Sequence, residues 1–298
     1  MAFTNVRAPV CKKLYATDAS PTGAGSCVAV QLKRDQTRPE LGDAICSGCR
    51  ADVADMISEG TAIRCPRSCG KMVCCLECYG THYHVCPHKE APVPAFSERW
   101  SGPNCPLTKA VLKEGIDVVE PYDMKRNPAM DFFADSGKQI WDDLDNESID
   151  VEHHALDCKT MSRARGRPFY IDGYRYEGPP ALRDEWNVMG FPTLRGASAI
   201  RVRQGNRMSL RSVKRCKQLC SRGKKFSLEH PYRSFLWYMK PTVELAEHQD
   251  VRMAVFSNCC FGGRRRKWTA VLTNCVELYE ALHRPECPHG DYEDYQPF

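Results

Sequence analysis

The segment that decides the fold of the N-terminal part reads Cys46-x2-Cys49, Cys65-x3-Cys69, Cys74-Cys75-x2-Cys78, followed by His82, His84, Cys86 and His88. It contains eight of the chain's 18 cysteines. Thiolate and imidazole are preferred ligands of Zn2+, which binds four of them tetrahedrally, often as pairs closely spaced in sequence. Because so short a segment has little apolar sequence for a core, we expect metal binding to supply most of its folding energy.

The order of these pairs resembles that of cross-braced zinc modules of the RING or B-box kind. In such modules the first and third pairs share one ion, and the second and fourth pairs share the other. The resemblance implies one site made of Cys46, Cys49, Cys75 and Cys78, and a second made of Cys65, Cys69, His82 and Cys86. The sequence leaves open the choice between Cys74 and Cys75, and the choice among His82, His84 and His88.

A disulfide framework is the alternative interpretation of these cysteines, and it requires an oxidising compartment. Residues 1–7 lead into polar sequence without the apolar stretch of a secretory signal. The sequence also lacks an apolar run long enough to span a bilayer. We therefore expect zinc rather than disulfides, an intracellular location (nuclear or cytoplasmic), and no membrane association.

Basic residues are concentrated in two places, although the net charge is only +5. From Arg195 to Lys225 there are eleven Lys or Arg and no Asp or Glu, and residues 264–267 form a second cluster. Such local density suits a polyanion, because each neutralised phosphate releases condensed counterions. The alternative is a solvated helix face with acidic neighbours from elsewhere in the fold. We expect a nucleic-acid partner.

The 298-residue chain divides into a lead segment (1–40), a Cys/His-rich zinc-binding module (41–90) and a larger domain (95–298). In the larger domain, hydrophobic runs typical of strands alternate with stretches typical of helices. The expected strands are 96–100, 116–120, 149–156, 226–228, 251–256 and 268–273, and the expected helices are 107–114, 140–144 and 206–220. This alternation predicts an α/β fold with a mainly parallel sheet.

Residues with useful chemistry directly follow the expected strands. Ser101-Gly102 follows the first strand and Asp123 follows the second. Asp157-Cys158 and Glu229-His230-Pro231 follow two later ones. In parallel sheets, ligands bind at the carboxyl ends of the strands, near the point where strand order reverses. We therefore expect these residues to lie at one edge of the sheet.

From about Phe96 to Asn274 the chain resembles the DNA cytosine-C5 methyltransferases, particularly divergent phage-like and mobile-element-like members. Glu98-Arg99-Trp100-Ser101-Gly102 is similar to the family's cofactor motif, Asp157-Cys158-Lys159-Thr160-Met161-Ser162 to its nucleophile loop, and Cys260-Phe261-Gly262 to a late segment. The resemblance implies a Rossmann-like methyltransferase domain that uses S-adenosylmethionine and acts on DNA rather than RNA. It implies that Cys158 is the nucleophile and Glu229 the acid that contacts the base. It implies that the cofactor is bound by Trp100, Ser101, Gly102, Asp123 and Asp131.

Six basic residues are candidates for nucleic-acid binding. They come from the loop around Cys158 (residues 157–165, the Cys158 loop), from the basic stretch 195–225 and from the cluster 264–267. They are Arg163, Arg165, Arg207, Arg211, Arg265 and Lys267. Asp157 stands where the family has proline, and His230 stands where it has asparagine. These departures favour an alternative function, that of a catalytically inactive zinc- and nucleic-acid-binding protein, or a protein-binding one of the RING or B-box kind.

Residues 14–25 of the lead segment resemble the first strand and turn of RNase H-like domains in retroelement polymerases. In those domains an aspartate at the position of Asp18 binds Mg2+ together with other carboxylates. Matching carboxylates do not follow before the zinc segment. The fragment therefore indicates a mobile-element origin rather than a second active site.

Overall fold

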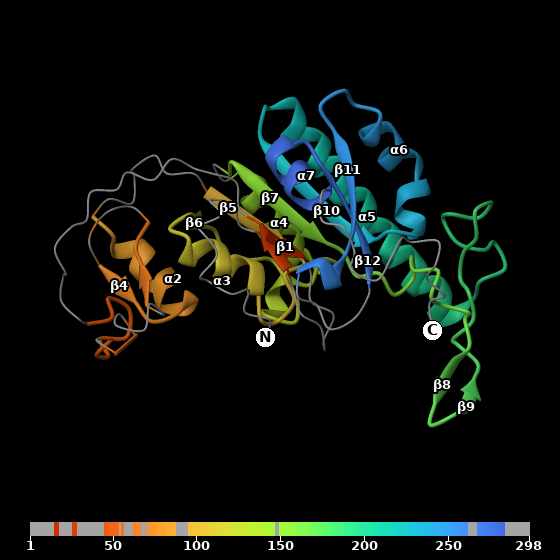
Figure 1. Cartoon of the computed structure of the whole chain (residues 1–298), viewed down its shortest axis with the longest axis horizontal. Coiled ribbons are helices and arrows are strands. Elements are labelled where there is room, and N and C mark those ends of the chain that lie inside the picture. Colours follow the sequence, from red (N-terminus) through yellow and green to blue (C-terminus); the bar gives the residue numbers. More distant parts are fainter. Residues whose placement is uncertain are drawn as a thin grey trace.

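The computed structural model describes residues 15–17, 26–28, 45–53, 55–56, 62–66, 69, 71–87, 95–146, 149–261 and 267–283. A six-stranded sheet in the order β11-β12-β10-β7-β5-β6 forms the centre of the larger domain (Figure 1). Its strands are β5 (Ala95–Arg99), β6 (Asp117–Val118), β7 (Val151–Ala155), β10 (Lys225–Pro231), β11 (Arg252–Ser257) and β12 (Trp268–Thr273). The expected mixed α/β fold with a mostly parallel sheet is confirmed.

Strand directions locate the reversal point of the sheet. Strands β6, β5, β7 and β10 pair in parallel, whereas β12 pairs antiparallel with both β10 and β11. The chain passes from β5 to β6 on one side and then returns to place β7 on the other side of β5. The strand order therefore reverses between β5 and β7, and ligands of open α/β sheets bind at the carboxyl end of such a point.

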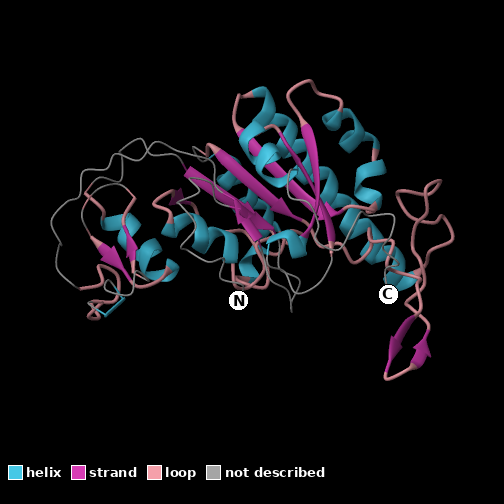
Figure 2. Cartoon of the chain, viewed as in Figure 1, coloured by secondary structure: helices cyan, strands magenta, loops and turns pink. Residues whose placement is uncertain are grey.

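Neighbouring residues of β5 show which helices cover which face. Glu98 accepts a hydrogen bond from the backbone N–H of Thr108 in α3 (Pro106–Lys113), at 2.9 Å. The next residue, Arg99, bonds Asp145 in α4 (Asp135–Asn146), at 3.3 Å. Because successive strand residues point to opposite faces, α3 and α4 cover opposite faces of the sheet. Helix α5 (Gly196–Ser221) packs on the α4 face, and α7 (Val276–His283) packs over β11 and β12 (Figure 2).

The α4 and α5 face carries the largest hydrophobic core. Its centre is aromatic: the ring centroid of Trp100 lies 5.2–5.5 Å from those of Tyr122, Phe132 and Trp141. All four side chains are at least nine-tenths buried. Leucines and valines of α5, β10 and α6 (Lys240–Ala246) extend this core along the sheet. Aromatic pairs of this kind add to the stabilisation that burial of their area gives.

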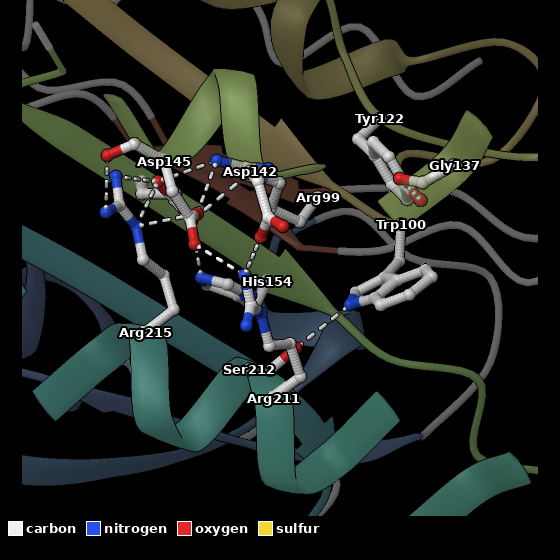
Figure 3. Close-up of polar contacts among 11 residues, drawn as sticks. Arg99, Trp100, Tyr122, Gly137, Asp142, Asp145, His154, Arg211, Ser212 and Arg215 are labelled. Carbon is white, nitrogen blue, oxygen red and sulfur yellow. Dashed lines mark hydrogen bonds and ion pairs between the residues drawn. The ribbon is translucent and has the colours of Figure 1, made fainter. Parts of the chain in front are cut away.

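A buried network of charges crosses the same face (Figure 3). Glu152 of β7, which is fully buried, contacts Arg99 at 3.2 Å, Arg215 of α5 at 3.1 Å and His154 at 2.9 Å. Asp145 of α4 also contacts Arg99 and Arg215, at 3.3 and 3.4 Å. The network therefore ties β5, β7, α4 and α5 together. Removing one member of such a network leaves an uncompensated buried charge.

The zinc segment forms a small module at the β6 end of the sheet (Figure 1). It contains β3 (Ile63–Arg64), β4 (Met72–Val73) and α2 (Leu76–Val85). Its buried residues, among them Val73 and Tyr79, belong to one hydrophobic cluster with Leu112 of α3 and Val118 of β6. The hydroxyl of Tyr79 donates a hydrogen bond to Asp117 of β6. The module and the sheet therefore share a core.

Several elements differ from the sequence expectation. Helix α5 begins at Gly196, ten residues before the expected start, and ends as expected before Gly223, whose φ of +69° is typical of the residue after a helix. A short hairpin, β8 (Phe169–Ile171) and β9 (Tyr174–Tyr176), was not expected. The remaining short elements are η1 (Pro128–Met130), η2 (Phe235–Tyr238) and η3 (Asn258–Phe261).

In the lead segment the structure describes two strands, β1 (Tyr15–Thr17) and β2 (Ser26–Val28), which pair antiparallel and lie next to α7. Asp18 lies outside the described residues. Among the described residues, no helix combines the length and apolar character that crossing a membrane requires.

Candidate metal centres and active-site edge

Two groups of four Cys and His residues converge in the module. One consists of Cys46, Cys49, Cys74 and Cys78, and the other of Cys65, Cys69, His82 and Cys86. Within each group the possible ligand atoms lie within 4.8 Å of one another. The first and third pairs thus meet, as do the second and fourth, in the cross-braced order that the sequence predicts. These groups could hold a metal such as zinc.

Distances between the ligand atoms fit zinc better than disulfides. Four thiolates around one Zn2+ with Zn–S of ~2.3 Å lie about 3.8 Å apart. The sulfur of Cys74 lies 3.7 Å from those of Cys46 and Cys49 and 3.4 Å from that of Cys78. In the second group the sulfurs of Cys65 and Cys86 are 3.8 Å apart. None of the cysteines in these two groups is bound in a disulfide.

The first group contains Cys74 where the sequence interpretation had placed Cys75. Cys74 follows β4, whereas Cys75 is the extended N-cap residue of α2, with φ of −158°. The group whose sulfurs all lie within 4.8 Å of one another contains Cys74 and not Cys75. The sulfur of Cys75 lies 3.7 Å from that of Cys74, next to the group.

His82 completes the second group, and its ring also contacts Ser47, which lies beside the first group. Its Nε2 lies 3.2 Å from the sulfur of Cys69, and its Nδ1 lies 2.8 Å from the hydroxyl of Ser47. Ser47 is the residue next to Cys46, a member of the first group. A hydrogen bond to the second ring nitrogen fixes the tautomer and orientation of a metal-binding histidine. The side chain of His84 and all of His88 lie outside the described residues.

Two of the expected cofactor residues meet after β5. The backbone N–H of Gly102 donates to the Asp123 carboxylate at 2.9 Å, and Gly102 has a φ of +69°, which favours glycine. Ser101 beside it is buried.

Glu98, also buried, has its pKa raised to about 7, because burial outweighs the hydrogen bonds from Thr108. An acid of this kind can be neutral near physiological pH.

The other two expected cofactor residues occupy packed positions. Trp100 is buried in the aromatic core, and its indole N–H donates to the hydroxyl of Ser212 in α5 at 3.0 Å. The carboxylate of Asp131 accepts a hydrogen bond from the backbone N–H of Phe133 at 2.9 Å, which closes the turn before α4. Both contacts stabilise the fold around the reversal point.

Cys158 follows β7, whereas Glu229, expected just after its strand, lies within the neighbouring parallel strand β10, which extends to Pro231. Glu229 of β10 pairs in register with Ala155 of β7, three residues before Cys158. Glu229 is buried, and burial raises the pKa of its carboxyl, an effect that Lys267 at 3.8 Å partly offsets. Burial lowers the pKa of His230 to about 3, so this imidazole is neutral at physiological pH.

The Cys158 loop is a tight turn. The carbonyl of Cys158 accepts hydrogen bonds from the backbone N–H groups of Met161 and Ser162, at 3.0 and 2.8 Å. Asp157 is exposed and forms an ion pair with Lys159 at 3.0 Å. This pairing partly compensates the negative charge that Asp157 places beside the thiol.

Arg183 fixes the Cys158 loop, a role that no sequence pattern predicted. The residue is buried and donates hydrogen bonds to the carbonyl of Thr160 at 2.9 Å, to the carbonyl of Val188 at 2.7 Å and to the side chain of Asn206 at 2.6 Å. Burial lowers the pKa of its guanidinium to about 10. Because Thr160 and Asn206 each lie 23 residues from Arg183 in sequence, spacing could not reveal these contacts.

The basic candidates fall into separate environments. Arg207 lies over the ring of Phe133 at 5.3 Å, and Arg211 forms ion pairs with Asp142 and Asp145. Near the Cys158 loop, Arg163 pairs with Glu185, and Arg165 donates to the carbonyl of Pro180 at 2.7 Å. Arg265 lies outside the described residues. Acidic neighbours therefore compensate part of the basic stretch, as the solvated-face alternative expects.

A groove between α4 and α5 retains excess positive charge. It is lined by three apolar residues, one acid and four cations, namely Phe132, Trp141, Leu210, Asp142, Lys138, Arg207, Arg211 and Lys214. Both helices precede the strands that they pack on, so they begin on the same side of the sheet as the Cys158 loop. The groove is thus a candidate surface for a polyanion.

Comparison of the chain with protein-family models, curated proteins and solved structures finds no match.

Proposed function

We propose that the chain is an S-adenosylmethionine-dependent DNA cytosine-C5 methyltransferase-like protein with a zinc-binding module. The observation that carries this proposal is the order of residues along one sheet edge. Gly102 and Asp123 are hydrogen-bonded beside the reversal point, the Cys158 turn follows β7, and the buried Glu229 lies in the neighbouring strand β10. Open α/β sheets bind ligands at this place.

The residues at this edge are suited to activating a cytosine. A thiolate of Cys158 would add to C6 of the base, because thiolates are strong nucleophiles near neutral pH. Glu229, whose carboxyl has its pKa raised by burial, would donate a hydrogen bond to the N3 edge in its protonated form and stabilise the charge that develops there. The target base must leave the duplex stack to reach both groups.

S-adenosylmethionine, when bound, supplies the methyl group that C5 of the activated base receives. Loss of the C5 proton and cleavage of the bond between C6 and Cys158 then release the product and regenerate the thiolate. Gly102 and Asp123 would hold the cofactor. Arg183 would act as a positioning residue, since it holds Thr160 of the same loop by two hydrogen bonds, at 2.9 and 3.1 Å.

In the module, Cys46, Cys49, Cys74 and Cys78 would hold one Zn2+, and the second group would hold another. Four-coordinate sites with all positions filled by protein ligands are structural rather than catalytic. We therefore assign the module to folding and to binding, and not to the methyl-transfer step.

One observation favours a second candidate, a catalytically inactive zinc- and nucleic-acid-binding protein of mobile-element origin. Trp100 follows β5 directly, yet its ring is buried among Tyr122, Phe132 and Trp141 rather than facing an open site. Such packing would conserve the fold without requiring a cofactor.

Covalent trapping separates the two candidates. DNA that contains 5-fluorocytosine blocks the proton loss that releases the protein, so an active chain incubated with this DNA and S-adenosylmethionine should become crosslinked. Cys158→Ser should abolish the crosslink, because a hydroxyl is a far weaker nucleophile. Cys220→Ser, at a half-buried thiol on α5, is the matched control and should still crosslink.

Absence of crosslinking in the native chain and in Asp157→Pro, with DNA binding retained in both, would favour the inactive protein. Calorimetric titration with S-adenosylmethionine gives an independent result. Measurable binding that weakens in Asp123→Asn supports the methyltransferase, because this change removes the charge of the carboxylate next to Gly102.

A further inference from the structure

An exposed hairpin follows the Cys158 loop and projects from the body of the domain (Figure 1). Its strands β8 and β9 form a two-stranded sheet of their own. Asp172 and Gly173 connect them with φ of +50° and +81°. Two positive φ angles are typical of a type I′ turn, whose twist matches that of the flanking strands. We call residues 168–177 the arm.

The base of the arm is closed. A Cβ atom at Gly178 would lie 2.1 Å from the carbonyl oxygen of Arg167, so the two sides of the base touch. The side chain of Arg165 bridges the base as well, donating to the carbonyl of Pro180 at 2.7 Å. These contacts direct the arm outward from a fixed point beside the Cys158 loop.

The arm exposes large apolar side chains that contribute little to folding. Tyr174 is 73% exposed and Ile171 is 52% exposed. An isolated two-stranded hairpin is only marginally stable in water, and exposed apolar clusters on such elements mark binding sites. Trp186, in the segment that follows the arm, is 92% exposed. The exposed aromatic rings therefore indicate a partner that offers flat surfaces.

Charge around the arm favours a polyanion. Between Lys159 and Ala181 there are five Lys or Arg and two Asp or Glu. Lys159 and Arg163 pair with Asp157 and Glu185 just outside this range, so the cations that remain for phosphates are Arg165, Arg167 and Arg175. Arg175 pairs with Glu177 at 3.0 Å, but both side chains are more than half exposed, and such pairs are weak and easily exchanged. A protein partner would need only apolar surface, whereas aromatic rings flanked by excess arginine fit unpaired bases and the phosphates between them.

We propose that the arm binds nucleic acid by stacking an unpaired base on Tyr174, with the arginines at its base contacting phosphates. This inference rests on the proposed nucleic-acid partner. It adds the element of the fold that would hold a strand with an unpaired base. Because the base of the arm follows the Cys158 loop in sequence, a strand that runs from Tyr174 along the arginines at the base would lead toward that loop.

The test measures the affinity of the full-length, zinc-loaded protein for a fluorescently labelled single-stranded DNA, by anisotropy. Tyr174→Ala should weaken binding about 5- to 150-fold, the loss measured for one base–aromatic stack. Tyr174→Phe keeps the ring and should bind like the native chain. Tyr174→Leu keeps apolar area without the ring and should be as weak as Tyr174→Ala. Val276→Ala on α7, at a side chain that is 54% exposed, is the control and should have no effect.

Salt dependence gives a second readout. Tyr174→Ala removes no phosphate contact, so the slope of log affinity against log salt should stay unchanged, whereas Arg167→Ala, at an exposed arginine at the base of the arm, should reduce it. Deletion of residues 168–177, which joins Arg167 to the adjacent Gly178, should weaken binding at least as much as Tyr174→Ala. Its melting temperature should stay close to that of the native chain.

Native affinity in Tyr174→Ala or in the deletion variant would overturn the inference, as would failure of the native chain to bind the DNA. Binding restored by Tyr174→Leu would show a general apolar contact instead of stacking. If 5-fluorocytosine trapping fails while affinity still depends on the Tyr174 ring, the methyltransferase proposal falls and the arm inference stands. If trapping succeeds while Tyr174→Ala binds the DNA with native affinity, the methyltransferase proposal stands and the arm inference falls.

Discussion

The zinc module and the α/β domain are held together by different chemistry. The module places eight possible metal ligands in two groups around a few buried residues. The domain instead buries an aromatic cluster and a network of opposite charges centred on Glu152. If zinc binds as proposed, one region depends on an ion from solution, and the other depends on its own side chains. We therefore expect metal loss to affect mainly the module and loss of buried charge to affect mainly the domain. The hydrophobic cluster that both regions share should couple the two responses.

The largest expected effect is metal loss from the module. Structural Zn2+ contributes on the order of 10–16 kcal/mol in small metal-dependent domains, so Cys74→Ser should lose one of two bound ions and much of the module's stability. Cys75→Ser, at the adjacent residue outside the group, is the matched control and should keep both ions. Elemental analysis of the purified variants measures this. Zinc loss in Cys75→Ser with retention in Cys74→Ser would reverse the ligand assignment.

Loss of the central charge in the domain should have the next largest effect. Glu152→Gln leaves Arg99 and Arg215 buried without their main counterion, which should lower the free energy of unfolding by about 3–5 kcal/mol. Asp142→Asn alters the exposed end of the same network and should cost under ~1 kcal/mol. Urea denaturation measures both. Equal losses would show that the buried position of Glu152 has no special weight.

The same carboxylate predicts a pH dependence. Burial raises the pKa of Glu152, but His154, Arg99 and Arg215 outweigh burial and lower the pKa to about 2. Because the folded pKa lies below the unfolded value of about 4.3, its contribution is fully present above that value and is lost as pH falls toward 2. The stability of Glu152→Gln should therefore fall less than that of the native chain between about pH 4.3 and pH 2, the interval bounded by these two pKa values.

A smaller effect should appear within the module. Ser47 accepts or donates a hydrogen bond at Nδ1 of His82, at 2.8 Å, and so links the two groups of ligands. Removing such a contact typically weakens metal affinity about 10- to 100-fold. Ser47→Ala should speed zinc release from the second group, whereas Ser47→Thr keeps the hydroxyl and should not. Release into a chromogenic chelator measures the rate, and identical rates in all three proteins would show that the groups are independent.

The predictable features of both regions are those that sequence spacing encodes. Pair spacing placed Cys46 with Cys49 and Cys65 with Cys69, and hydrophobic runs placed β5, β7, β10, β11 and β12 within a few residues of their observed bounds. The choice between Cys74 and Cys75 depends on where α2 begins, which spacing does not give. Asp172-Gly173 between two aromatic runs is a strong hairpin signal, so the arm was accessible to sequence reasoning.

Long-range polar contacts were not predictable in this way. Arg183 bonds residues on both sides of it in sequence, from Thr160 to Asn206, and Arg99 meets Glu152 only because β5 and β7 are neighbours. The pairing of Arg211 with Asp142 likewise converts an apparently free basic residue into part of a network. Charge counts along a sequence cannot show which cations are compensated in space.

The shared core leads to the smallest effect and the sharpest test of the comparison. Tyr79 of α2 is buried and donates to Asp117 of β6, so Tyr79→Phe removes one hydrogen bond between the regions and should cost about 1–3 kcal/mol. All five tryptophans lie between residues 100 and 268, so their fluorescence reports on the α/β domain, while zinc release reports on the module. In the native chain both signals should change at the same urea concentration, because one hydrophobic cluster spans both regions. In Tyr79→Phe both midpoints should fall, and zinc release should come first, since the module loses its anchor on the sheet. If zinc release already precedes the fluorescence change in the native chain, the module and the domain are separate folding units, and the contacts between them contribute little.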